Sequence, residues 1–301
     1  MPITSRNFKS ASMDDWTSDF WEVYGQKDKL RSPAEIWSMA VSHASEAAKV
    51  LRTGEFDLIR RPLAHTFCWL SALIGSIQRD TSDAPPFQAF KDRRRFSSLK
   101  EIVWYKYPEH CPACGSRHCE CPVLRGRLIE DDGPDAWKEH RDKAWKRMAR
   151  YRKEPCLKHS LADWQRMFEG IYLGAHDSLR YEDIGFHFLE EVGETSRAIV
   201  MLATGEKTSV DPSKLRQDFY TEVADTISWL FSLLTKLRIQ VGRFARLSQS
   251  DPNGDAHLDL SEILWDEYNG LKEGIDGLRC PTCLQRPCSP TCVPDLEVKT
   301  Y

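Results

Sequence analysis

An internal repetition is the feature that most constrains the fold, because a chain that contains the same sequence pattern twice is expected to fold into two similar units. Residues near the start of the chain recur 148 positions later without a gap, a second block recurs after 160 positions, and a set of cysteines recurs after 169. Each half therefore has two helical segments followed by a cysteine cluster. The matched positions are Trp16 and Trp164, Phe20 and Phe168, Tyr24 and Tyr172, Ile36 and Ile184, Glu46 and Glu194, residues 63–66 and 223–226, Trp69 and Trp229, Leu70 and Leu230, and Cys111, Cys114 and Cys119 with Cys280, Cys283 and Cys288.

The hydrophobic pattern of both halves predicts helices. In the second half, Phe188, Val192, Thr195 and Ile199 recur at steps of three and four, and a similar stripe begins at Phe219. Alternating β-branched runs are few, and none is joined to another by an Asn-Gly or Asp-Gly turn. We therefore expect an all-α helical bundle.

The repeat also predicts how the chain is divided. Residues 1–121 form a first repeat with its cysteine cluster, residues 122–160 form a connector, and residues 161–301 form a second repeat with its own cluster. The connector holds one strongly charged candidate helix over residues 135–153. The change in offset places about twelve extra residues around Thr204–Lys214, where Gly205 and Asp211-Pro212 are typical of a loop.

Five carboxylates gather in two short motifs of the second half. Like charges at i,i+3 and i,i+4 spacing destabilise a helix unless they are compensated, and a hard cation such as Mg²⁺ or Mn²⁺ compensates them. The alternative is a pair of amphipathic helices whose acidic residues face solvent. Apolar neighbours and the mid-helix Gly193, which costs about 1 kcal/mol relative to alanine and usually permits a close approach, favour a site. The five residues are Glu190, Glu191, Glu194, Glu222 and Asp225.

These motifs carry a resemblance. The segments FHFLEEVGETSRAIVML, residues 186–202, and EVADTISWLFSLL, residues 222–234, resemble the ExxE and ExxD signature of the MazG-like all-α NTP pyrophosphatases, which include the dimeric dUTPases. The likeness is strong over residues 164–238 and degenerate over residues 16–77. It implies Mg²⁺-dependent hydrolysis of a nucleoside triphosphate to the monophosphate and pyrophosphate. By position, Glu191, Glu194, Glu222 and Asp225 would hold the metal, and Glu190 would be a further ligand or the base that activates water.

Substrate-binding residues are less specific. Arg197, Lys236 and Arg238 are candidates for contacting the phosphates, although such residues are more often solvated surface charges. Trp229 can stack on a base or pack in the core. The chain has no G-x-x-x-x-G-K-[ST] loop, which excludes a P-loop ATPase.

The first half keeps one of the five carboxylates. Ser42, His43, Glu46, Pro62 and His65 stand where the second half has its acidic set, so a second hard-metal centre is not expected. His43, Glu46 and His65 could instead bind a softer metal, or serve as core or pocket residues. Members of the resembled family often complete their pockets with a neighbouring subunit. The degenerate copy could replace that neighbour. A homo-oligomer is the other possibility.

Two clusters of four thiols predict about two structural Zn²⁺ ions per chain. Free or redox-active thiols and an iron–sulfur cluster are the alternatives, and His118 or His110 could replace one thiol of the first cluster. Cys68 is expected in the core, and Cys156 has no assignment. The clusters are Cys111, Cys114, Cys119 and Cys121, and Cys280, Cys283, Cys288 and Cys292.

Two basic stretches support a rival function, a non-catalytic zinc-containing module that binds nucleotide or nucleic acid. They are residues 91–95 and residues 138–153, the latter with eight Lys and Arg. A solvated helix that packs its Trp137, Trp145 and Met148 side on the bundle is the simpler interpretation. The net charge of −3 does not indicate a protein that is basic over its whole surface and coats nucleic acid. Nucleic-acid binding would also leave the carboxylates unexplained.

The expected location is the cytoplasm. No apolar run follows the first twelve residues, and the longest nearly apolar stretch, residues 66–77, is too short to cross a bilayer. A hydrophobic content of 41% is ample for a folded core. Ten cysteines without an export signal are typical of thiolate chemistry in a reducing compartment.

Overall fold

A computed structural model describes residues 2–79, 96, 98–156, 160–204, 211–247, 258–271 and 274–292, without the side chains of Arg79 and residues 240–247. These residues form ten α-helices, two 3₁₀ turns and two isolated β-bridges, which confirms the all-α fold class. None of the helices in these ranges has the length and apolar character of a membrane span.

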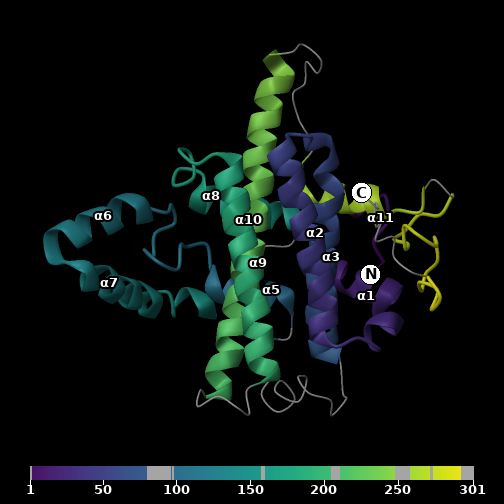
Figure 1. The fold of residues 1–301 in the computed structure, drawn as a ribbon, viewed down its shortest axis with the longest axis horizontal. Helices are drawn as coiled ribbons and strands as arrows, with labels where there is room; N and C mark the ends of the chain where they lie inside the picture. The colour runs from purple at the N-terminus through teal and green to yellow at the C-terminus, as the bar shows by residue number, and fades with distance from the viewer. Residues whose placement is uncertain are drawn as a thin grey trace.

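Four long helices make the centre of the molecule (Figure 1). Helix α2 (Pro33–Thr53) lies beside α3 (Arg60–Arg79), and α9 (Tyr181–Ala203) lies beside α10 (Pro212–Leu247). The two pairs meet where α2 packs on α9. Trp37 Nε1 donates a hydrogen bond to Ser196 Oγ across this contact, at 2.7 Å.

Capping residues explain where several helices begin. Ser12, Ser32 and Ser160 precede α1 (Met13–Asp28), α2 and α8 (Leu161–Tyr172), and each forms a capping box with the acidic residue three positions later. Such boxes satisfy amide groups that would otherwise lack partners in the first turn. The predicted stripe of α9 is confirmed, because its apolar positions and Thr195 are all buried.

The ends of the two halves pack crosswise. Helix α5 (Leu99–Lys106) contacts α1 and α10, whereas α11 (Leu260–Tyr268) contacts α3 and α8. The Cys119 amide donates to the Ile171 carbonyl of α8 at 2.6 Å, and the Cys288 amide donates to the Val23 carbonyl of α1 at 2.7 Å. Both halves therefore contribute to one hydrophobic core, and the boundaries expected from the sequence stay a prediction.

The connector differs from the expected single helix over residues 135–153. It contains α6 (Cys121–Asp132) and α7 (Pro134–Arg147), which form a hairpin projecting from the bundle (Figure 1), and a 3₁₀ turn at Tyr151–Lys153. Gly133, with a φ of 88°, separates the two helices, and Pro134 begins the second one. Residues 205–210 of the expected loop insertion lie outside the described residues.

Candidate functional site

Three of the predicted metal ligands meet between α9 and α10. One carboxylate oxygen from each of Glu191, Glu194 and Glu222 lies within 4.8 Å of the other two. Glu191 and Glu194 are on one face of α9 because they are three residues apart, and the packing of α10 on α9 brings Glu222 to them. All three are partly buried. This geometry suits a single hard cation.

The electrostatics of this carboxylate cluster favour a cation as well. Burial raises the pKa of Glu191 to about 8, and the charges of Asp225, Glu222 and Glu194 add to this effect against Lys106. Burial and the nearby Asp225 likewise raise the pKa of Glu222 to about 7. Glu191 Oε2 is buried and has no hydrogen-bond partner within the described residues. An unpartnered buried carboxylate oxygen among like charges is costly, and a bound metal ion would remove that cost.

The fourth predicted ligand, Asp225, has partners of its own. Lys106 Nζ and the Tyr107 hydroxyl both bond its carboxylate, one oxygen each. Burial and the charge of Asp225 hold the pKa of Tyr107 well above its usual value, so Tyr107 stays a donor. Lys106 and Tyr107 come from the end of α5, and nothing in the local sequence pattern marks them as site residues.

Glu190 is not part of the converging group. Its Oε2 lies 3.0 Å from His187 Nδ1, and 62% of its side chain is exposed. Gly193 is not crowded by a neighbouring segment. Apart from its two chain neighbours and the backbone of its own helix, no atom of the described residues lies within 4 Å of where its Cβ would be. The close approach expected at that glycine is therefore not made by the described part of the chain.

A cavity of about 990 Å³ adjoins the cluster. Glu191, Asp225 and Lys106 line it on the bundle side, and the α6–α7 hairpin lines it on the other side. Aromatic side chains from both sides contribute, and they are Tyr107, Trp137, Trp145, Tyr172, His176, His187 and Trp229. The cavity is at the upper end of the roughly 300–1,000 Å³ typical of small-molecule sites.

Trp229 belongs to a stack of rings on the bundle side of this cavity. The imidazoles of His176 and His187 stack on its indole at 4.8 and 4.6 Å, and Tyr172 stacks on His176 at 5.1 Å. Burial, helped by the nearby charges of His187 and Lys236, lowers the pKa of His176 to about 4, so this ring is neutral. Trp229 is half-buried and lines the cavity.

The three predicted phosphate-binding cations are held differently. Arg197 is exposed, one turn beyond Glu194, with 3.7 Å between their charged groups. Lys236 Nζ donates to the carbonyls of His176 and Asp177 at 3.0 and 3.1 Å. Arg238 pairs with Glu169 at 2.6 Å. None of the three lines the cavity beside Asp225.

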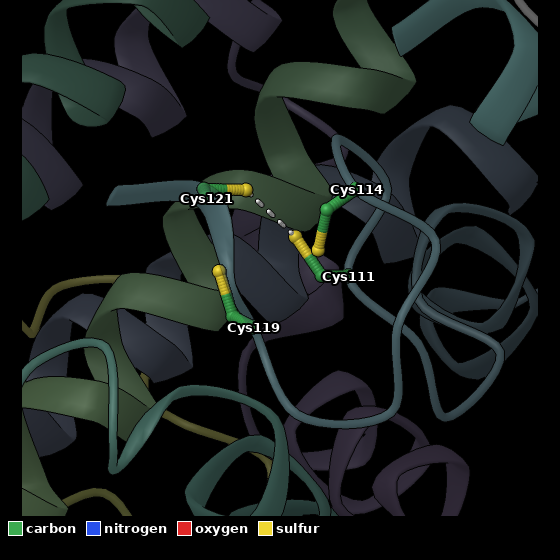
Figure 2. A group of neighbouring side chains, drawn as sticks. All are labelled: Cys111, Cys114, Cys119 and Cys121. Atoms are coloured by element: carbon green, nitrogen blue, oxygen red, sulfur yellow. Dashed lines mark hydrogen bonds between the residues drawn. The ribbon is translucent and has the colours of Figure 1, made fainter. Parts of the chain in front are cut away.

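The first cysteine cluster has the geometry of a closed metal site. The four thiols converge in Figure 2, with all sulfur atoms within 4.8 Å of one another and 3.5 Å between those of Cys111 and Cys121. Tetrahedral Zn–S bonds of about 2.3 Å place sulfur atoms about 3.8 Å apart. Histidine is not needed here, because the four thiols alone supply four converging ligand atoms. Nδ1 of His118 lies 2.7 Å from the Gly170 carbonyl, and Nδ1 of His110 lies 2.7 Å from the Pro108 carbonyl.

The second cluster repeats this arrangement. The Cys280–Cys292 and Cys283–Cys288 sulfur pairs are each 3.8 Å apart, and all four sulfur atoms lie within 4.8 Å. Two clusters of four cysteines are thus present, consistent with two structural zinc sites. Cys68 is in the core as expected, and burial raises the pKa of its thiol. Cys156 is half-buried against the core.

The histidines of the first half do not form the alternative metal site. His43 Nδ1 lies 3.0 Å from Glu46, while His65 Nε2 lies 2.7 Å from Glu267 of α11. The two imidazoles are 4.6 Å apart, yet His43, Glu46 and His65 do not bring three ligand atoms together. The pocket around them has a volume of about 40 Å³.

Comparisons of this chain with protein-family models, with curated proteins and with solved structures find no match.

Proposed function

We propose that this protein is a Mg²⁺-dependent nucleoside triphosphate pyrophosphohydrolase with its catalytic carboxylates on α9 and α10. The observation that carries this proposal is the convergence of Glu191, Glu194 and Glu222, with a buried unpartnered Glu191 oxygen, beside a large cavity. The resemblance of both motifs to the MazG-like signature supplies the reaction class.

The donor set fits Mg²⁺, because carboxylate oxygens are the hard ligands that this ion prefers. Glu191, Glu194 and Glu222 would hold it, with Asp225 as a fourth ligand once Lys106 releases that carboxylate. Bound Mg²⁺ supplies neutralisation of phosphate charge and orientation of the reacting groups. Among the described residues, Lys106 is the one lysine or arginine on the bundle wall of the cavity, and it would turn to a phosphate oxygen.

Glu190 keeps its proposed role as the base that accepts a proton from the attacking water. Its carboxylate lies 3.0 Å from His187, which lines the cavity, and it would have to turn from this contact toward the cluster. A general base must come within hydrogen-bond reach of the water, although catalytic contacts often tighten only in the substrate complex.

The duplication is part of this proposal. Two observations support it: the paired sequence offsets and the crosswise bonds from Cys119 to Ile171 and from Cys288 to Val23. We propose that the first half takes the place of the partner subunit that completes the pocket in relatives. Each cysteine cluster then holds one structural Zn²⁺, which joins one half to the other.

The test is a screen of purified protein against canonical and modified NTPs and dNTPs, with the products identified. We expect monophosphate and pyrophosphate in the presence of Mg²⁺ or Mn²⁺, and no turnover with Glu222→Gln. Release of inorganic phosphate instead would exclude cleavage between the α- and β-phosphates. No turnover of any nucleotide would contradict the proposal.

The second candidate is a non-catalytic zinc-containing module that binds nucleotide or nucleic acid. The basic α7 favours it, whereas the residues 91–95 stretch lies outside the described residues. This candidate predicts salt-sensitive binding of nucleic acid by a protein that does not hydrolyse triphosphates.

A further inference from the structure

The α6–α7 hairpin brings cations to the wall of the cavity that faces the carboxylates. Arg125 of α6 and Lys138 and Arg141 of α7 line this wall, and Asp142 is the acidic residue that the hairpin adds there. Glu191 and Asp225 line the wall on the bundle side. A ligand in the cavity therefore lies between acidic groups suited to a metal ion and basic groups suited to an anion.

These three cations have no acidic partner in the described part of the chain. Lys143 on the same helix, by contrast, pairs with Glu139 at 2.6 Å. Arg and Lys side chains that are already paired would have to give up that partner to bind a phosphate. Arg125, Lys138 and Arg141 would not, so they are available to an anion in the cavity.

The first cysteine cluster fixes the position of this wall. Cys121 is both a member of the cluster and the first residue of α6. The far end of the hairpin is anchored too, because Ala144 and Met148 are buried and the Arg152 guanidinium lies 3.5 Å from the centre of the Trp145 ring. The hairpin is therefore held where it leaves the bundle and where it returns, and its inner face stands at a defined distance from α9 and α10.

We infer that the α6–α7 hairpin is the phosphate-binding wall of the site, and that a nucleoside triphosphate is held between the carboxylate cluster and Arg125, Lys138 and Arg141. This inference rests on the proposed function. A triphosphate carries more negative charge than one divalent ion neutralises, and opposed basic side chains are the usual complement. The base then lies along the aromatic side chains of the cavity, among them Trp137 and Trp229.

The test compares two double variants that remove equal charge from the same two helices. Arg125→Gln/Arg141→Gln alters the cavity wall, whereas Arg127→Gln/Lys146→Gln alters exposed residues of α6 and α7 that do not line the cavity. The measurements are KM and kcat for NTP hydrolysis, and the Kd of a non-hydrolysable α,β-imido NTP by calorimetry with Mg²⁺. Circular dichroism melting shows whether each variant is folded, and Lys138→Gln is the milder substitute if the double variant is not.

We expect Arg125→Gln/Arg141→Gln to raise KM and the analogue Kd by about tenfold or more, since a charge-assisted hydrogen bond contributes on that order. The value of kcat should change far less, because these contacts bind rather than react. The control variant should stay within about twofold of wild type. Equal effects of the two variants, or none from either, would overturn the inference while the hydrolase proposal stands.

A failure of the proposed function gives a different result. If wild-type protein binds the analogue but hydrolyses no NTP, the proposed hydrolase activity is contradicted. Binding that still depends on Arg125 and Arg141 would then support the hairpin as the phosphate-binding wall. Wild-type protein that fails to bind the analogue overturns the inference. The inference is also overturned if the protein binds a single-stranded oligonucleotide through Arg125 and Arg141 but does not bind the nucleotide analogue.

Discussion

The α9–α10 site and the α2–α3 pocket carry their acidic residue on different elements. On α10, Asp225 accepts bonds from Lys106 and Tyr107, which lie just before the first cysteine cluster. On α3, the imidazole of His65 contacts Glu267 of α11, which lies before the second cluster. The carboxylate is on the long helix α10 in the first case and on the short helix α11 in the second.

The two pockets also differ in size. The α9–α10 cavity measures about 990 Å³ and the α2–α3 pocket about 40 Å³. In the smaller pocket, the Arg31 guanidinium lies 5.2 Å from the Trp69 ring centre and pairs with the buried Asp28 at 2.7 Å. Its own side chains satisfy one another, whereas the larger cavity leaves both carboxylate and cationic groups to be satisfied. The α2–α3 pair thus borders a small pocket with paired side chains, whereas the α9–α10 pair borders an open site.

The sharpest way to break this comparison is to neutralise the matched glutamates. Glu194→Gln should lower turnover by roughly a thousandfold or more, because it removes an anionic metal ligand. Glu46→Gln should leave kcat within a fewfold of wild type, since its carboxylate contacts only His43 among the described side chains. Steady-state pyrophosphate release measures both. Equal losses would mean that the two halves share one catalytic centre.

The two cysteine clusters can be separated next. Cys114→Ser and Cys283→Ser should each reduce zinc from about two ions per chain to about one and cost several kcal/mol in the free energy of unfolding, because metal binding at a closed site is linked to folding. Elemental analysis and thermal melting measure these effects. Only Cys114→Ser should also raise KM, through the α6–α7 hairpin. Protein purified without chelators that contains no zinc would refute both structural sites.

The pH dependence of stability should reveal the carboxylate cluster without any catalytic assay. The pKa values of Glu191 and Glu222, about 8 and 7, exceed the unfolded value of 4.5. The folded metal-free chain therefore binds more protons than the unfolded chain between about pH 5 and 8, so these two groups lower its stability as the pH rises.

Adding Mg²⁺ should consequently raise Tm more at pH 8 than at pH 5, because protons compete with the metal at low pH. Glu191→Gln/Glu222→Gln should remove the difference, and Glu46→Gln should keep it. Thermal melts at several pH values provide the measurement. An equal gain in Tm at both pH values would argue against a metal at this cluster.

The smallest expected effect concerns the turn inside each cysteine cluster. Gly115 and Leu284 both have left-handed backbone, with φ of 77° and 57°. Glycine adopts this conformation freely, whereas a leucine is strained by about 1–2 kcal/mol. Leu284→Gly should stabilise the protein by about 0.5–1 kcal/mol, and Gly115→Ala should destabilise it by about 1 kcal/mol. Chemical denaturation compares them, and the opposite signs would contradict this account.

Local patterns were sufficient for some elements and insufficient for others. The stripe from Phe188 to Ile199 predicts α9 because helical periodicity depends only on residues three and four positions apart in the sequence. The same reasoning extends the connector helix beyond Arg147 and misses α6 before Gly133, where charged residues have no apolar stripe to mark a boundary. Met148 is buried as expected, whereas Trp137 and Trp145 both line the cavity, and Trp145 also stacks with Arg152.

The amino-acid sequence by itself determined the helical class, the two sets of four thiols and the three glutamates that converge, since each depends on spacing within one or two neighbouring segments. Only the tertiary structure decided that Lys106 and Tyr107 hold Asp225, that each cysteine cluster docks on the opposite half, and that a hairpin of cations faces the carboxylates. These contacts join residues far apart in the chain. Their partners are chosen by how the helices pack, and helix packing depends on the whole buried surface at once.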